Sequence, residues 1–275
     1  MTPAQIFSAK NASGIRAVLR DLAQGWSMRA VWRTFAWDEI QSRYRRSALG
    51  LAWIVLSYLM FAGGIALFFG GLANSEGFGY FHYIAVGYPV FTLLVGNLSE
   101  GCWVFRGASS WIQSSSMPYS VYVFKGVARS AFPFAIQITA AVVVLLLTGW
   151  RPTLPVILLC VPALLLILAT AIPLQLCLGF LGARYRDLQH LIASVQRLLI
   201  FITPVIWIYE DTSGLRRALA IFNPLTHYLE VFRAPMLGRV PPLESMVIAP
   251  ALTVLTWLLA LFVAARMRKN LPFWI

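Results

Sequence analysis

"LAWIVLSYLMFAGGIALFFGGL", residues 51–72, is an apolar stretch that contains no charged side chain. A helix needs about 20 mostly apolar residues to cross a lipid bilayer, and this stretch is long enough to do so. The whole chain of 275 residues is 59% hydrophobic and only 12% charged, with a mean hydropathy of +0.74. Because a soluble domain has about 25% charged residues, this composition predicts an integral membrane protein.

Five further apolar stretches qualify, or nearly qualify, as membrane spans. Several of them contain proline, which neighbouring helices in a bundle can accommodate. We therefore expect an all-α integral membrane protein with a single membrane domain over residues 1–275. The six predicted spans are 51–72, 80–99, about 127–149, 154–182, 191–209 and 246–265.

Lysine and arginine are distributed unevenly between the connections. Residues 1–50 contain eight of them, whereas residues 73–79 contain none. Because cytoplasmic connections are rich in lysine and arginine, we expect both termini to lie in the cytoplasm. The net charge of +12 gathers at the ends of apolar stretches, where it meets anionic lipid head groups. This placement argues against nucleic acid as a partner.

Residues 29–48 precede the first span and are amphipathic. Apolar residues recur at every fourth position from Trp32 to Tyr44, and arginines occupy other faces. This pattern predicts a helix that lies in the membrane interface. Its arginines alone could serve to anchor the chain, but Asp38 and Glu39 give the helix a mixed-charge face that could recognise another protein.

Residues 210–245 are too polar to span the membrane, yet "LAIFNPLTHYLEVFRAPML" is unusually apolar for a solvated loop. We expect short helices that lie at the outer face or dip into it as a re-entrant segment. The alternative is an ordinary extracytoplasmic loop, which would not need so many large apolar side chains.

Four short motifs follow one another in a familiar order: "RYRRSALGLAW" at 43–53, "ARYRDL" at 183–188, "FITPVIW" at 201–207 and "FNPLTHYLEVFR" at 222–233. Together they resemble the ABC-2-type permeases of polysaccharide export, and O-antigen exporters in particular. Capsular polysaccharide and teichoic acid exporters share this architecture and remain alternatives. An ABC-2 exporter of small molecules is a further alternative, although such chains more often carry a large outer domain or a fused ATPase.

The resemblance implies a half-transporter in the bacterial inner (cytoplasmic) membrane. Two copies of the chain would form the pathway for a polyprenyl-diphosphate-linked glycan, and two copies of an ATP-binding subunit would hold ATP and Mg²⁺. The sequence itself contains no GxxxxGK[ST] phosphate loop, so we expect it to bind no cofactor. We also expect no metal site, because its cysteines and histidines lack metal-ligand spacing. A membrane-embedded enzyme would need clustered catalytic side chains, and none is evident, so the chain is predicted to be a non-catalytic subunit.

The resemblance also implies contact with the ATPase through the interface helix and the connection 106–126. The alternative for that connection is a simple polar linker. The predicted coupling residues are Asp38, Glu39, Arg43, Ser114, Ser115, Ser116, Pro118 and Tyr119.

Arginines at the predicted cytoplasmic face could bind the lipid diphosphate, since guanidinium matches phosphate oxygens, or could only fix the topology; these are Arg45, Arg46, Arg184 and Arg186. Aromatic side chains could line the path, although interfacial anchoring also enriches them near span ends. The path candidates are Tyr58, Phe61, Tyr83, Tyr88, Phe91, Phe201 and Trp207, and the outer-segment motif contributes Asn223 and Pro224. Ionisable residues near or within spans are functional candidates by default, namely Glu100, Arg129 and Arg197.

Overall fold

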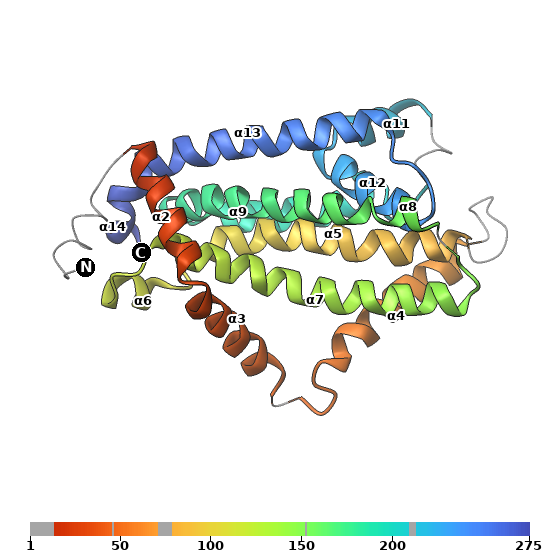
Figure 1. The fold of residues 1–275 in the computed structure, drawn as a ribbon, viewed down its shortest axis with the longest axis horizontal. Helices are drawn as coiled ribbons and strands as arrows, with labels where there is room; N and C mark the ends of the chain where they lie inside the picture. The colour runs from red at the N-terminus through yellow and green to blue at the C-terminus, as the bar shows by residue number, and fades with distance from the viewer. Residues whose placement is uncertain (1–13, 46, 71–78, 152, 209–212) are drawn as a thin grey trace.

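A computed structural model describes residues 14–45, 47–70, 79–151, 153–208 and 213–275, and within these ranges every regular element is a helix. Figure 1 shows a bundle of long helices with shorter ones at its two ends. The elements are α2 (Ile15–Ser27), α3 (Arg29–Tyr44), α4 (Ala52–Phe69), α5 (Gly79–Trp103), α6 (Ser109–Ser114), α7 (Tyr119–Leu147), α8 (Leu154–Ile157), α9 (Cys160–Arg184), α10 (Leu188–Ile202), α11 (Gly214–Phe222), α12 (Pro224–Met236), α13 (Leu243–Met267), η1 (Arg268–Asn270) and α14 (Leu271–Trp274).

Five helical stretches are long and apolar enough to cross a membrane: α4, α5, α7, α8 with α9, and α13 with the short helices that follow it. The predicted all-α membrane fold is therefore confirmed. The sixth predicted span, 191–209, corresponds to α10, which has 15 residues and ends at Ile202. At 1.5 Å per residue α10 is about 22 Å long, shorter than the roughly 30 Å hydrocarbon core. The count of six spans stays a prediction.

α10 ends early because of Pro204. A residue before proline is pushed out of the helical conformation, and Thr203 is indeed extended, with φ −81° and ψ 135°. The predicted ends of two spans, at 72 and 209, lie outside the described residues, as does the start of the outer segment at 210–212.

Two other predicted boundaries differ from the structure. The interface helix ends at Tyr44 rather than at 48, and residues 47–50 form bends and a turn before α4. The connection predicted at 106–126 is shorter, because α7 already begins at Tyr119, and its first turns are buried against the other helices. No element was predicted for residues 15–27, which form α2.

The centre of the bundle is held by close contact between helices α5 and α9. A Cβ atom on Gly182 would lie 2.4 Å from the carbonyl oxygen of Cys102, so only glycine fits at this crossing. Small residues at such crossings let helix backbones approach each other. Nearby, the Gln175 amide donates to Asn97 Oδ1 at 2.7 Å, a hydrogen bond that joins two buried polar side chains across the same pair of helices.

The short helices gather at the two ends of the bundle. Helices α2, α6 and α14 lie at one end, here called the α2 end, and α8 and α11 lie at the other (Figure 1). Helices α3 and α4 diverge from the bundle and form a V, which places the turn between them away from the core (Figure 1).

Candidate coupling junction and substrate path

Helix α3 is joined to two spans by a chain of charged side chains, here called the α3 junction: Glu39, Glu100, Lys125 and Arg129. Glu39 Oε1 lies 2.5 Å from Lys125 Nζ, and Glu39 Oε2 lies 2.5 Å from Arg129 Nη1. Arg129 also pairs with Glu100 of α5. One carboxylate of α3 is thus tied to α7, and through Arg129 to α5.

The α3 junction is balanced in charge, with two carboxylates and two cations. The Lys125 and Arg129 side chains are only 11% and 20% exposed, whereas Glu39 is 38% exposed. Removing one partner from such a cluster leaves a poorly solvated charge without compensation, which destabilises more than losing an exposed pair. A displacement of α3 must therefore move α7 or break this cluster.

A second polar contact fixes α2 at the same end. The Asp21 carboxylate accepts hydrogen bonds from the backbone N–H groups of Tyr119 and Ser120, at 3.0 and 2.8 Å. These are the first unpaired N–H groups of α7, where a negative charge is favoured by the helix dipole. Arg268 donates to the same carboxylate at 2.9 Å and to the carbonyl oxygen of Ala17 at 2.7 Å.

The predicted coupling residues divide into two groups. Asp38, Arg43, Ser114 and Ser116 are exposed, and Ser115 and Pro118 are half-buried. Tyr119 is only 2% exposed, and its ring packs on Phe105 and Phe180. Glu39 uses both carboxylate oxygens within the chain. Tyr119 is therefore a packing residue at the start of α7, because the burial of its ring leaves no surface for a partner, and Glu39 belongs to the α3 junction.

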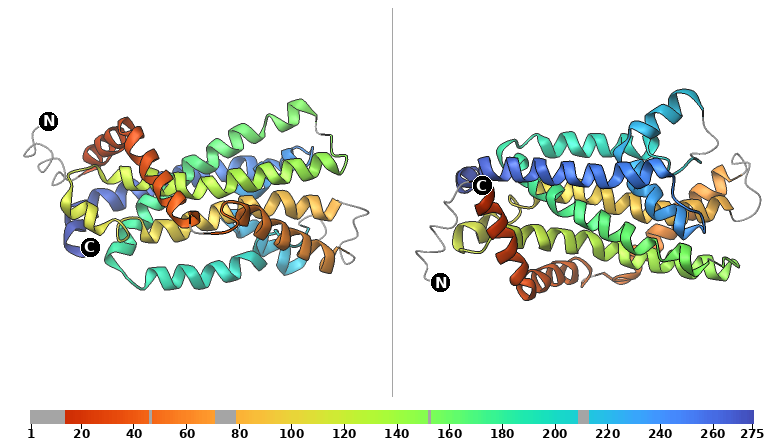
Figure 2. Two further views of the ribbon diagram at one scale, coloured as in Figure 1. Left: turned by 90° about the horizontal axis from the view of Figure 1, so that it is seen from below. Right: turned by 45° about the horizontal axis from the view of Figure 1, so that its top comes forward.

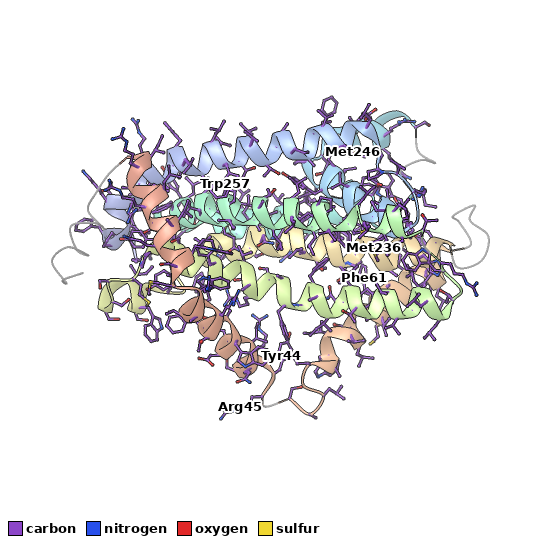
Figure 3. The ribbon with its side chains drawn as sticks, viewed as in Figure 1. Tyr44, Arg45, Phe61, Met236, Met246 and Trp257 are labelled. Carbon is purple, nitrogen blue, oxygen red and sulfur yellow. The ribbon has the colours of Figure 1, made fainter. Side chains whose placement is uncertain are left out.

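The predicted phosphate-binding arginines are exposed where the structure describes them. Arg45 lies at the end of α3 and points away from the bundle (Figure 3). Arg184 stacks near the rings of Tyr185 and Trp274, with 5.3 Å from its guanidinium carbon to each ring centre. Arg186 is exposed in the turn before α10. Arg46 lies outside the described residues.

The break after α10 is held by buried polar groups from α5 and α12. Arg233 is completely buried, pairs with Glu230 and donates to the carbonyl oxygen of Pro204 at 2.5 Å. Its guanidinium lies 3.6 Å from the centre of the Tyr83 ring, a close cation–π contact. Asn223 donates to Thr203 Oγ1 at 2.8 Å.

These contacts bring together two of the motifs found in the sequence, "FITPVIW" and "FNPLTHYLEVFR". Asn223 also caps α12 by accepting from the N–H of Leu225 at 3.0 Å, and Pro224 occupies the first turn, where a missing N–H costs nothing. Residues 226–236 of α12 are all buried. This part of the predicted outer segment is therefore a helix inside the bundle, which stabilises the unwound backbone at Thr203–Pro204.

The predicted path residues lie in different environments. Tyr58, Tyr83 and Phe91 are buried inside the bundle, at 1%, 3% and 4% exposure. Tyr58 donates to the carbonyl oxygen of Ala85 at 2.9 Å, so it packs α4 against α5 rather than lining an open surface. These three side chains therefore hold helices together.

The remaining path candidates are more accessible. Phe61 stacks on Tyr88 with 4.0 Å between ring centres, and both are half-buried. Figure 3 shows Phe61 on α4. Phe201 is 65% exposed on α10, and Trp207 Nε1 donates to its carbonyl oxygen at 2.9 Å.

In the described part of the chain, no group of three or more His, Cys, Asp or Glu side chains is placed to hold a metal ion. The polar groups described above connect helices to one another. What this arrangement provides is mechanical: two surface helices are fastened to spans, and the chain has a fixed break after α10.

The fold and these contacts define an integral membrane protein whose amphipathic helices are fastened to its spans at one end. The chain belongs to the ABC-2 type transporter family, whose model matches residues 30–237. It is similar to the O-antigen export system permease protein RfbA of Myxococcus xanthus, with 25% identity over 227 residues, which cover 80% of this chain and 85% of that protein. The resemblance found in the motifs is thereby confirmed, and the chain is a transport subunit by family.

Asp21, Arg268 and the pair of Glu230 and Arg233 were not predicted from the sequence. The ion pair of Glu230 and Arg233 could have been predicted, because acidic and basic residues three positions apart lie on the same face of a helix. Asp21 and Arg268 are 247 residues apart, and no local pattern connects them.

Proposed function

We propose that the chain is the membrane-spanning subunit of an ATP-driven exporter that moves lipid-linked polysaccharide, of the O-antigen type, across the bacterial inner membrane. Two copies of the chain would form the pathway, and two copies of a separate ATP-binding subunit would drive it. The family match over residues 30–237 carries this proposal. The name of the Myxococcus xanthus relative supports the substrate class.

The arrangement at the α2 end supports a coupling role for α3 and for the connection between α5 and α7. Asp38 and Arg43 on α3, and Ser114 and Ser116 on the connection, are exposed and are the proposed contacts of the ATPase. The α3 junction would transmit a displacement of α3 to α7 and α5. Its ion pairs are less exposed than ordinary surface pairs, and breaking them is therefore more costly.

The first experiment is native mass spectrometry of the chain purified in mild detergent from its own membrane. We expect a complex that contains two copies of this chain and two copies of a subunit with a phosphate-loop motif. Export of labelled glycan in cells that lack the chain would then identify the cargo when each candidate polysaccharide is tested in turn. A stable chain that copurifies with no ATPase would overturn the proposal.

A second experiment separates coupling from topology for the arginines before α4. Lysine at positions 43, 45 and 46 keeps the positive charge but removes the planar guanidinium geometry. If these arginines contact the ATPase or a phosphate group, glycan export falls while the amount of chain in the membrane is unchanged. Unchanged export would reduce their role to fixing the topology.

A further inference from the structure

Helix α10 is the least buried long helix in the described part of the chain. None of its residues is buried, and in both views of Figure 2 it lies at the outer edge of the bundle. One side of it contacts α5: Gln196 donates to the carbonyl oxygen of Val95 at 2.6 Å and accepts from Ser99 at 2.8 Å. Leu199 and Ile200 pack on the bundle core from the same side.

The opposite side of α10 carries a polar stripe, defined here as His190, Ser194 and Arg197. At 100° per residue these side chains, together with Phe201, fall within an arc of about 60° that points away from α5. All four are exposed. Apolar side chains such as Leu191 and Leu198 flank the stripe and are also exposed.

The position of Arg197 along α10 makes contact with lipid tails costly. It lies about 14 Å from the first residue of a helix about 22 Å long, so it is not at an end from which it could reach lipid head groups. In the described ranges no carboxylate pairs with Arg197. By contrast, Arg129 and Arg233 each pair with a glutamate of this chain.

From this we infer that Arg197 binds the diphosphate of the lipid-linked substrate, at the point where it passes along the polar stripe of α10. This inference rests on the proposed function, since it names a substrate contact within that pathway. A planar guanidinium matches phosphate oxygens bidentately, and the compensating anion that Arg197 lacks among the described residues would come from the cargo. The exposed Phe201 on the same arc gives the stripe an apolar end.

The binding test uses the full chain in phosphatidylcholine nanodiscs and a radiolabelled polyprenyl diphosphate without sugar. We expect Arg197→Ala to weaken binding about 10-fold or more, as for the loss of a charged hydrogen bond. The uncharged polyprenol should bind both proteins equally. Arg16→Ala removes an exposed arginine of α2 and serves as the control of equal charge, with unchanged affinity expected.

Several results would overturn the inference. One is an Arg197→Ala variant that binds the diphosphate as tightly as the parent chain. Another is displacement by phosphatidylglycerol or free inorganic diphosphate that is as efficient as displacement by the polyprenyl diphosphate, which would indicate an ordinary anion site. A loss of dimer with unchanged diphosphate binding would assign the stripe to contact with a second copy.

Thiol labelling tests the location of the stripe without a ligand. A membrane-impermeant methanethiosulfonate should modify Arg197→Cys and leave Leu198→Cys, on the apolar flank, unmodified. The native thiols Cys102 and Cys160 are buried and Cys177 is partly exposed, and the parent chain gives the background from all three. An unreactive Arg197→Cys variant would place the stripe in lipid or packed protein and would also overturn the inference.

The two proposals can fail separately. If no ATPase copurifies while diphosphate binding depends on Arg197, the exporter assignment fails and the site remains. If the ATPase copurifies and Arg197→Ala binds the diphosphate normally, only the site fails.

Discussion

Asp21→Asn should strongly destabilise the chain, although Asp21 lies far from the centre of the bundle. Its carboxylate serves three donors: the N–H groups of Tyr119 and Ser120 and the guanidinium of Arg268. The Asp21 and Arg268 side chains are each only 6% exposed. Asparagine has nearly the same shape and keeps one oxygen, but it loses the charge.

The size of the effect follows from the buried arginine. Breaking a buried ion pair by removing one partner costs about 3–5 kcal/mol, and losing the negative charge at the start of α7 adds roughly 0.3–1 kcal/mol. A loss of 1 kcal/mol lowers the unfolding midpoint by about 2–4 °C for chains of a similar size. We therefore expect the midpoint to fall by about 6 °C or more.

The assay can use thiols that the fold protects. Cys102 and Cys160 are 1% and 9% exposed, whereas Cys177 is partly exposed. In a chain with Cys177 replaced by serine, a thiol-reactive fluorophore therefore reports unfolding when the detergent-solubilised protein is heated. Asp38→Asn, an exposed substitution on the neighbouring α3, is the matched control and should leave the midpoint unchanged. Arg268→Gln should be as harmful as Asp21→Asn.

The double variant decides whether the ion pair is responsible. If it is, the double variant Asp21→Asn with Arg268→Gln should lose much less stability than the two single variants lose in total. The reason is that both charges are removed in the double variant, so no isolated charge stays buried. Additive losses, or an Asp21→Asn midpoint within about 1 °C of the parent, would refute the reasoning.

Three further substitutions test other contacts. Gly182→Ala should lower the free energy of unfolding by about 1–3 kcal/mol, because its Cβ would lie 2.4 Å from the Cys102 carbonyl oxygen; the thiol assay measures this. Arg233→Met should cost about 3–5 kcal/mol by the same assay, because it leaves the buried Glu230 carboxylate unpaired. Glu39→Gln should loosen α3, which is held through that carboxylate; amide hydrogen exchange in α3 should accelerate about 5- to 30-fold for a loss of 1–2 kcal/mol.

Each of these has a control. Gly96→Ala adds the same methyl group to α5, where no atom lies within 4 Å, and should not destabilise. Adding Glu230→Leu to Arg233→Met should recover much of the lost stability, and failure to do so would mean that the arginine acts mainly through Pro204. Exchange in α3 that is equally slow in Glu39→Gln and in Asp38→Asn would remove the α3 junction as the anchor of this helix.

The long elements could be predicted because each is specified locally. An uninterrupted apolar stretch is enough to predict a span, and a four-residue apolar period is enough to predict the helix that contains Trp32 and Tyr44. The early end of α10 could also have been read from Pro204, since the residue before proline avoids the helical conformation.

The site was harder to predict because its contacts join distant residues. The sequence placed Glu39 on a mixed-charge face but could not show that its carboxylate meets Lys125 and Arg129, which depends on how α3 packs on α7. Tyr58 and Tyr83 looked like path residues because aromatic composition carries no information about the rotation of a helix. Burial, which decides their role, comes only from tertiary packing.

The contact of Arg268 with Ala17 and Asp21 also has a consequence for biosynthesis. The ribosome makes the two residues of this contact 247 residues apart. At about 5–20 residues per second, the ribosome adds Arg268 roughly 12–50 s after it adds Asp21. During that interval α2 and the start of α7 lack their final fastening, and chaperones or proteases of the membrane can still reach them. The synthesis of Arg268 is thus the step that allows the α2 end to close.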